Sequence, residues 1–268
     1  MTTAELVIDE LSVTFGGLKA LDSVSMRAGG NEVVGVIGPN GAGKTTLFNV
    51  ICGFVRPSRG HLEFDGRQLR RHQPHDLAGM GIARTLQGVG LFAGLTVVDN
   101  VMAGATARVR TGLAASMLGL PRGAREETEL RERAMTVLRE LRVDGYADRH
   151  PGGLPYGIQK RVALARALIN DPVVLLLDEP ASGLSEAEMD ELGTQVRGLA
   201  ERMTVLLVEH HMDLVMTVCD RIVVLDFGQV IAEGKPDQVR ADPAVTRAYL
   251  GEDVSVAAPG GFGEPGDA

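Results

Sequence analysis

A glycine-rich segment that contains a lysine and two threonines is the part of the sequence best suited to chemistry. It follows the apolar run 33–37, precedes a second apolar run at 47–51, and consists of Gly38, Pro39, Asn40, Gly41, Ala42, Gly43, Lys44, Thr45 and Thr46. The spacing GxxxxGK[ST] between a strand and a helix predicts a loop whose backbone N–H groups surround the phosphates of a nucleotide. Lys44 would place its charge beside the β- and γ-phosphates, and the Thr45 hydroxyl would be available to Mg²⁺. An ordinary glycine turn is the alternative, which the flanking strand and helix disfavour.

An acidic pair, Asp178 and Glu179, directly follows the apolar run 173–177. In open α/β sheets, ligands bind at the carboxyl ends of the strands, which is where this pair would lie. We therefore expect Asp178 to hold Mg²⁺ and Glu179 to position or deprotonate an attacking water. Acidic residues after a strand can also cap a helix. The phosphate loop upstream favours the catalytic interpretation.

The composition excludes several classes of protein. The chain has 268 residues and a formal net charge of −8, and its basic residues are scattered, so nucleic acid is not an expected partner. Cys52 and Cys219 lie far apart in helix-like segments, which predicts two reduced core thiols rather than a disulfide or a zinc site. The first residues do not resemble a secretory leader, and no run of about 18 apolar residues occurs. We expect a cytoplasmic chain that meets a membrane only through a partner.

The apolar patterns predict an α/β fold. Unbroken apolar runs at 173–177, 204–208 and 222–225 are typical of a parallel sheet buried on both faces. The segment 6–15 alternates apolar and polar residues in its second half, as a half-buried strand would. Together with the strand 61–64 and its Asp65-Gly66 turn, it predicts an antiparallel β subdomain. Residues 88–168 predict an inserted helical subdomain, which includes an amphipathic helix at 124–141. The apolar stretch 113–120 is too short to span a bilayer, and we expect 1–253 to form the domain and 254–268 a disordered tail.

These motifs, in this order, resemble the ATP-binding subunits of ABC transporters from about Leu6 to Leu250. The resemblance implies a P-loop NTPase core that binds and hydrolyses ATP with Mg²⁺. Gln87 matches the glutamine loop, which reaches the metal and couples the core to the helical subdomain, and His210 matches the histidine that contacts the γ-phosphate. Phe15 occupies the position of the aromatic residue that stacks on adenine, although a phenylalanine in a strand is more often part of a core. Tyr156 and Gly157 lie in the signature segment, which the family donates to the nucleotide across a dimer.

Two residues depart from the family pattern. Pro155 stands where the signature serine would bond the γ-phosphate, and it has neither a hydroxyl nor a backbone N–H. Ser185 stands where an aspartate is usual in the loop 181–185 that follows the acidic pair. We expect both changes to affect turnover or communication across the dimer rather than nucleotide binding.

The segments 81–87, 91–97, 105–125 and 208–216 resemble the ATPases of uptake systems for branched-chain amino acids or related amides. The implied role is to power a membrane permease by ATP-driven dimerisation, with a second ATPase subunit that is either identical or different. A solute-binding protein would be met only indirectly, and the chain would lie peripherally on the inner face of the membrane. An ATPase of a lipid or lipopolysaccharide exporter, a non-transport ABC ATPase and a nucleotide-binding regulator with little turnover remain alternatives.

Overall fold

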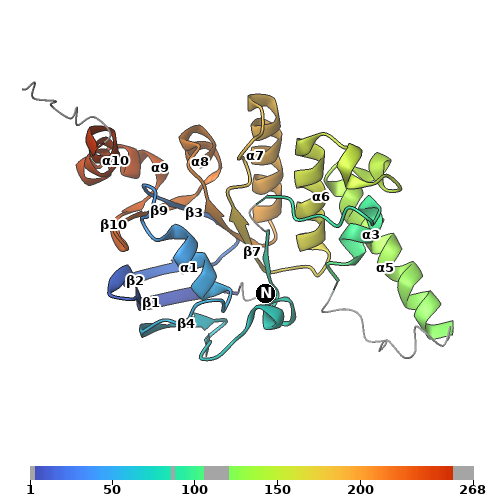
Figure 1. The fold of residues 1–268 in the computed structure, drawn as a ribbon, viewed down its shortest axis with the longest axis horizontal. Helices are drawn as coiled ribbons and strands as arrows, with labels where there is room; N and C mark the ends of the chain where they lie inside the picture. Colours follow the sequence, from blue (N-terminus) through green and yellow to red (C-terminus); the bar gives the residue numbers. More distant parts are fainter. Residues whose placement is uncertain (1–3, 86–87, 106–120, 256–268) are drawn as a thin grey trace, which may run out of the picture.

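A six-stranded sheet forms the centre of the molecule in the computed structural model, which describes residues 4–85, 88–105 and 121–255 (Figure 1). Its strand order is β10-β9-β3-β8-β7-β6, and β10 alone runs antiparallel to its neighbour. The strands are β3 (Val33–Ile37), β6 (Ile82–Arg84), β7 (Val174–Asp178), β8 (Thr204–Val208), β9 (Arg221–Asp226) and β10 (Gln229–Gly234). The predicted parallel sheet is confirmed, although β7 begins one residue later than the apolar run, at Val174, where its pairing with β6 and β8 starts.

The central strands are buried on both faces. In β8, Val205 and Leu207 pack in one hydrophobic cluster, whereas Leu206 and Val208 pack in a second cluster on the opposite face. This explains why the sequence shows unbroken apolar runs instead of alternation, because successive side chains of a strand point to opposite faces.

An antiparallel sheet covers one face of the core, as predicted. It has the order β2-β1-β4-β5 and consists of β1 (Leu6–Phe15), β2 (Leu18–Ala28), β4 (Arg59–Phe64) and β5 (Arg67–Gln68). Asp65 and Gly66 both have positive φ, as a tight hairpin between β4 and β5 requires. The alternation expected in the second half of β1 is wrong, because Leu11, Ser12 and Val13 are all buried where the pairing register shifts.

Helices α1 (Lys44–Ile51) and α2 (Leu77–Met80) pack on the same face as the antiparallel sheet, and most of the remaining helices cover the other face and the ends of the central sheet. The others described are α3 (Val97–Met102), α5 (Pro121–Glu140), α6 (Tyr156–Leu168), α7 (Glu186–Ala200), α8 (Met212–Val218), α9 (Pro236–Arg240) and α10 (Pro243–Ser255). Short 3₁₀ helices span Pro74–Asp76, Asp144–Tyr146 and Pro151–Gly153. Helices α3, α5 and α6 gather at the end of the molecule opposite α9 and α10 (Figure 1). Within 88–168 the described residues form helices and turns without strands, which agrees with the expected helical subdomain.

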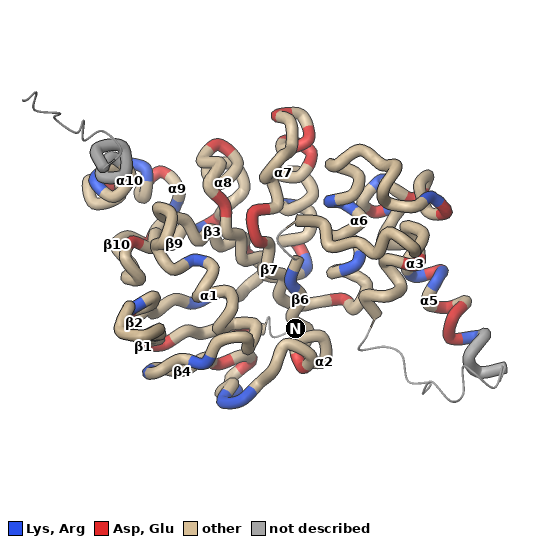
Figure 2. The backbone as a smooth tube through the Cα atoms, viewed as in Figure 1, with Lys and Arg blue, Asp and Glu red and all other residues tan. Residues whose placement is uncertain are grey.

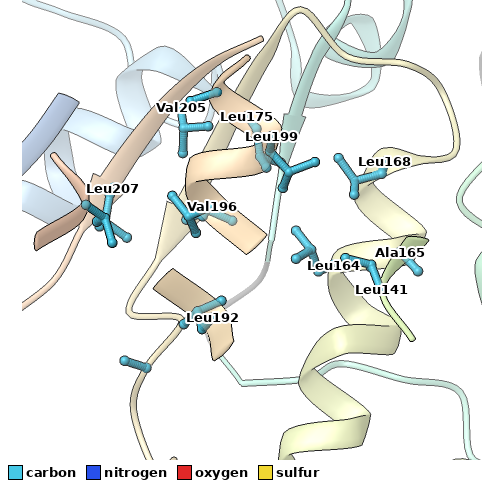
Figure 3. Packing of buried hydrophobic residues seen from close by; sticks show 14 of the residues in the cluster. Leu141, Leu164, Ala165, Leu168, Leu175, Leu192, Val196, Leu199, Val205 and Leu207 are labelled. Atoms are coloured by element: carbon cyan, nitrogen blue, oxygen red, sulfur yellow. The ribbon is translucent and has the colours of Figure 1, made fainter. Parts of the chain in front are cut away.

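The larger hydrophobic cluster joins the helical end to the sheet. Figure 3 shows Leu164 and Leu168 of α6 beside Leu192 and Val196 of α7, with Leu175 of β7 nearby. Helix α5 begins at Pro121 rather than 124 and ends at Glu140. Of the apolar positions predicted to share one face, Ala134, Val137, Leu138 and Leu141 are buried, Leu141 directly after the helix, and Leu130 is half-buried. The predicted apolar face of this helix is therefore confirmed.

The remaining expectations concern charge and the ends of the chain. Lys, Arg, Asp and Glu are interspersed along the trace in Figure 2. Cys52 and Cys219 are free and buried, as predicted, and burial raises the pKa of the Cys219 thiol to about 12. Among the described residues, no helix is long and apolar enough to cross a bilayer. Helix α10 runs to Ser255, two residues past the expected domain end, and the stretches 113–120 and 256–268 lie outside the described residues.

Candidate functional site

The glycine loop leaves the buried strand β3 and enters α1 at Lys44, as the motif predicts. Gly38, Gly41 and Gly43 all have positive φ, and Gly43 caps the helix without a side-chain hydrogen bond. A Cβ on Gly38 would lie 2.0 Å from the carbonyl oxygen of Leu225, so the loop packs directly on the backbone of β9. Helix α1 thus begins at a bare backbone terminus, the arrangement that suits an anion.

Lys44 bends over its own loop. Its Nζ donates hydrogen bonds to the carbonyl oxygens of Gly38 at 2.6 Å and Pro39 at 2.8 Å. Gly228 closes the loop from another side, because its N–H donates to the Ala42 carbonyl at 3.0 Å. The charge of Lys44 is therefore held at the loop that would surround a phosphate.

The acidic pair and the histidine lie at the same edge of the sheet as the glycine loop. Val208, the last residue of β8, is level with Val36 of β3 on one side and with Asp178 of β7 on the other. The three strands are parallel, so their carboxyl ends bring the glycine loop, the acidic pair and the segment from Glu209 together. This is the crevice position expected for a ligand in an open α/β sheet.

Asp178 is held by an arginine from the neighbouring strand. Arg84, at the end of β6, donates from Nη2 to Oδ2 of Asp178 at 2.7 Å and from Nη1 to Oδ1 of Asn49 at 2.9 Å. The exposed fractions of the Arg84 and Asp178 side chains are 12% and 4%. Burial lowers the pKa of Arg84, but the hydrogen bond to Asp178 and the electrostatic interactions with Cys52 and Asp178 together outweigh burial and leave that pKa raised. The guanidinium is charged, so Asp178 has a fixed cationic partner.

Glu179 occupies a conformation that is unusual for a residue with a side chain. Its φ is +48°, and its N–H donates to the carbonyl of Val208 at 2.9 Å. Lys160 of α6 donates from Nζ to the carbonyl oxygens of Glu179 at 3.2 Å and Pro180 at 2.7 Å. Burial lowers the pKa of Lys160, opposed by the charges of Glu209 and Glu179. Left-handed backbone outside glycine is costly and is enriched at functional sites, which fits the catalytic role expected of Glu179.

His210 lies beside a buried carboxylate. Glu209 is 1% exposed, and its Oε2 accepts hydrogen bonds from the N–H of His210 at 3.0 Å and from the ring Nδ1 of His211 at 2.8 Å. The side chain of His210 is 55% exposed and could reach a ligand. His211 is the N-cap residue of α8, without a side-chain hydrogen bond to the helix.

The signature segment contacts the loop that follows the acidic pair. Pro155 is the N-cap residue of α6, and Tyr156 and Gly157 form the first turn. A Cβ on Gly183 would lie 3.1 Å from the Tyr156 ring, and one on Gly157 would lie 2.2 Å from a carboxylate oxygen of Glu188. Tyr156 is 42% exposed. Within one chain this segment therefore lies beside 181–188.

The other predicted site residues are placed as follows. The ring of Phe15, at the end of β1, is 50% exposed and is not part of the core. Thr45 and Asn40 are exposed, and Thr46 is half-buried. Gln87 lies outside the described residues.

A groove of about 520 Å³ lies between the sheet core and the helical end. Phe54 and Phe92 line it with exposed rings, and Arg84 and Thr85 contribute from β6 and the residue after it. Asn170 also lines it, and its Oδ1 is buried without a hydrogen-bond partner among the described residues. The groove thus combines an apolar surface with a hydrogen-bond acceptor, Oδ1 of Asn170, that has no donor among the described residues.

Sequence reasoning missed three residues that shape this site, namely Arg84, Lys160 and Glu209. Arg84 could have been suspected because a charged residue ends the apolar run Ile82–Ala83, three residues before the glutamine loop. Glu209 follows an apolar strand as Asp178 does, which was a similar signal. Nothing in the spacing of Lys160 indicates that its amine bonds the carbonyl of Glu179.

Comparison with known proteins supports the same assignment of the chain. Residues 21–182 match the family model described as ABC transporter, and residues 229–255 match one described as branched-chain amino acid ATP-binding cassette transporter. The high-affinity branched-chain amino acid transport ATP-binding protein BraF of Pseudomonas aeruginosa is 40% identical over 94% of this chain and 100% of its own length. The lipopolysaccharide export system ATP-binding protein LptB of Haemophilus influenzae is 33% identical over 92% of this chain and 97% of its own.

Solved structures share the fold. An ATP-binding cassette of an ABC transporter in its ADP conformation superposes with a TM-score of 0.81 at 32% identity, covering 93% of this chain and 100% of that one. A dimeric bacterial ABC transporter cassette gives a TM-score of 0.72 at 26% identity, covering 86% and 98%.

Proposed function

This chain belongs to the ABC transporter family and is an ATPase, and on that premise we propose that it powers an importer of branched-chain or other hydrophobic amino acids or amides. The observation that carries the proposal is the joint match of its C-terminal residues 229–255 and of nearly its whole length to branched-chain amino acid cassettes. The lipopolysaccharide export relative is less similar, at 33% against 40% identity.

The phosphate loop would bind ATP. Its glycines bring backbone N–H groups to the start of α1, and Lys44 would exchange the carbonyls of Gly38 and Pro39 for phosphate oxygens. The exposed ring of Phe15 would stack on the adenine.

The donor set suits Mg²⁺. Asp178 offers a buried carboxylate, and Thr45 offers an exposed hydroxyl at the first turn of α1, both hard oxygen ligands. Gln87 would be a third ligand. When bound, Mg²⁺ would offset the negative charge of the phosphates.

Glu179 would orient and deprotonate the attacking water. Its backbone is tied to Val208 by its own N–H and to Lys160 by its carbonyl, so the side chain projects from a fixed point. The charge that develops on the transferred phosphoryl group would be met by Lys44 and by His210, which lies on the neighbouring strand's carboxyl end.

A second ATPase subunit would complete each site. Tyr156 lies against Gly183 and Gly157 lies against Glu188 of their own chain, and in a head-to-tail dimer Tyr156 and Gly157 would face the nucleotide of the other subunit. The dimeric cassette among the structural relatives supports this arrangement.

The groove would receive a segment of a membrane permease. Phe54 and Phe92 supply apolar contacts, and the Oδ1 of Asn170 would gain a donor from the incoming segment. The chain would then lie on the cytoplasmic face of the membrane through this partner, and a solute-binding protein would act only through the permease.

The first experiment measures Mg²⁺-dependent ATP hydrolysis by the wild type, Glu179→Gln and the surface control Glu201→Gln, with size-exclusion chromatography in ATP. We expect turnover in the wild type and control, and an ATP-trapped dimer without turnover in Glu179→Gln. Turnover that survives in Glu179→Gln would contradict the assigned water-activating role.

The second experiment tests the transported solute. Uptake of labelled leucine is measured in source cells that lack this gene and are complemented with the wild type, Glu179→Gln, or the groove variant Phe92→Asp. We expect the wild type alone to restore uptake. Normal uptake in the deletion strain would refute the amino-acid importer and favour the exporter role.

A further inference from the structure

Arg84 forms a buried bridge between the strand that ends in Asp178 and the helix that follows the phosphate loop. Its Nη2 bonds Asp178 at 2.7 Å, its Nη1 bonds Asn49 of α1 at 2.9 Å, and its guanidinium carbon lies 5.8 Å from the centre of the Phe48 ring. We propose that Arg84 is a positioning residue for hydrolysis, which fixes the carboxylate of Asp178 toward the phosphate loop. This inference rests on the proposed function of Asp178.

The register of the strands explains how the arginine reaches this place. Arg84 is level with Leu176 of β7, two residues before Asp178. Ile82 and Leu176 belong to the cluster on the face covered by α1, and alternation puts Arg84 and Asp178 on that same face. The guanidinium therefore extends along the sheet to the carboxylate and meets α1 above it.

The geometry of the Arg84–Asp178 pair says more about its role than its contribution to stability does. A buried ion pair often contributes little compared with apolar residues of similar volume, because both charges lose hydration. Arg84 also leaves its Nε buried without a hydrogen-bond partner among the described residues, which is a further cost. Its planar fork, in contrast, fixes two acceptors at once, which a lysine cannot do.

The bridge occupies one carboxylate oxygen of Asp178 and leaves the other oxygen available to a bound metal ion. Oδ2 of Asp178 accepts from Arg84, whereas Oδ1 accepts no hydrogen bond from a described residue. The hydrogen bond to Oδ2 fixes the side-chain rotamer of Asp178 and therefore the direction in which Oδ1 points. Partners of this kind around metal ligands typically change metal affinity or activity by about 10–100-fold when they are removed.

The same arginine also lines the groove between the core and the helical end. A permease segment seated there would touch the strand whose last residue holds Asp178. Arg84 therefore lies between the proposed docking surface and the proposed metal ligand.

The test uses the full chain and compares Arg84→Met, Arg84→Lys and a matched control, Arg221→Met. Arg221 is also partly buried and pairs with Glu32 at 2.9 Å and with Glu233, but it lies on β9 and contacts no residue of the proposed site. Mn²⁺ is the probe, and its binding to the ATP-loaded chain is followed by electron paramagnetic resonance. ATP binding in EDTA, kcat and KM are measured in parallel.

We expect Arg84→Met to weaken Mn²⁺ binding and lower kcat, each by roughly tenfold, with ATP binding in EDTA unchanged within about twofold. Arg84→Lys should recover part of both losses, and Arg221→Met should match the wild type. Wild-type Mn²⁺ affinity in a folded Arg84→Met overturns the inference, as does an equal loss in Arg221→Met. A wild type that binds no Mn²⁺ with ATP would overturn the proposed function and this inference together.

Discussion

The carboxylate of Glu209 accepts a hydrogen bond of 2.7 Å from the backbone N–H of Ala181. This bond joins the segment after β8 to the loop after β7, because Oε1 of Glu209 takes Ala181 while Oε2 takes the N–H groups of His210 and His211. A single buried side chain thereby sets the backbone of the proposed γ-phosphate histidine and of the loop that would face a second subunit.

Replacing that carboxylate with an amide should disturb both loops. Glu209→Gln keeps the shape but loses the charge and one acceptor oxygen, which leaves buried N–H donors without partners at a cost of about 1–3 kcal/mol. We expect kcat to fall by roughly tenfold or more, because a small misplacement of a catalytic group can cost about a hundredfold. Turnover and ATP affinity are measured well below the melting temperature, beside the exposed control Glu201→Gln. Unchanged turnover in Glu209→Gln would show that His210 does not depend on this carboxylate.

Much of the site could be predicted because its motifs are local in sequence. The phosphate loop follows β3 directly, and Asp178 follows an apolar run, so short patterns placed both correctly. The contacts of Arg84 with Asp178 and of Glu209 with Ala181 link residues 94 and 28 positions apart. Such contacts depend on strand order and register, which a single sequence does not specify. The unexpected burial of Ser12 has the same origin, since a register shift in β1 moved it from the exposed face.

The loop glycines should respond differently to alanine. A Cβ on Gly38 would meet the Leu225 carbonyl at 2.0 Å, whereas one on Gly41 would meet nothing within 4 Å. We expect Gly41→Ala to lower the free energy of unfolding by only about 1–2 kcal/mol, the cost of a left-handed non-glycine residue. Gly38→Ala should cost more than about 3 kcal/mol, because backbone must move as well. Urea unfolding of both variants measures the difference, and equal losses would contradict the close packing of the loop on β9.

Removing the loop lysine should greatly reduce the stabilisation of the protein by ATP, with little effect on its stability without ATP. ATP at a hundred times its Kd would stabilise the wild type by about 2.7 kcal/mol, and a variant that binds a hundredfold more weakly would retain about 0.4 kcal/mol at that concentration. We expect this contrast between the wild type and Lys44→Met, because Lys44 supplies the charge held at the loop. Thermal unfolding with and without ATP measures it. An undiminished ATP-induced shift in Lys44→Met would exclude Lys44 as a phosphate ligand.

Gly35 of β3 leaves room for the thiol of Cys219. A Cβ at Gly35 would lie 2.8 Å from Sγ of Cys219, so Gly35→Ala should overpack the core by about 1–3 kcal/mol. Cys219→Ala removes the obstructing atom, and the double variant should be more stable than the sum of the single losses predicts. Urea unfolding completes the cycle. Pairing Gly35→Ala with Cys52→Ala serves as the control and should be additive, because Cys52 packs in the other cluster; additivity with Cys219→Ala would contradict the contact.

Pro155 should lower the stability of the first turn of α6 and the stability of the closed dimer. It occupies the N-cap position with φ −51° and ψ 147° and offers no side-chain hydrogen bond to the helix. A serine there could accept from a first-turn N–H, which typically adds about 0.5–2 kcal/mol to stability.

The same serine would restore the hydroxyl that the family presents to the γ-phosphate. We expect Pro155→Ser to raise the melting temperature and, if the chain dimerises with itself, to raise kcat as well, since a hydrogen bond to a charged group contributes about 1.5–3 kcal/mol. Pro155→Ala is the matched control, because it removes the proline ring without adding a side-chain oxygen. Equal ATPase rates in the serine and alanine variants would show that the missing hydroxyl does not limit turnover in the homodimer. Turnover that rises when wild type is mixed with the double variant Pro155→Ser/Lys44→Met, but not when it is mixed with Lys44→Met alone, would place the serine's effect on the site of the opposite subunit, because only the wild-type phosphate loop can then bind ATP.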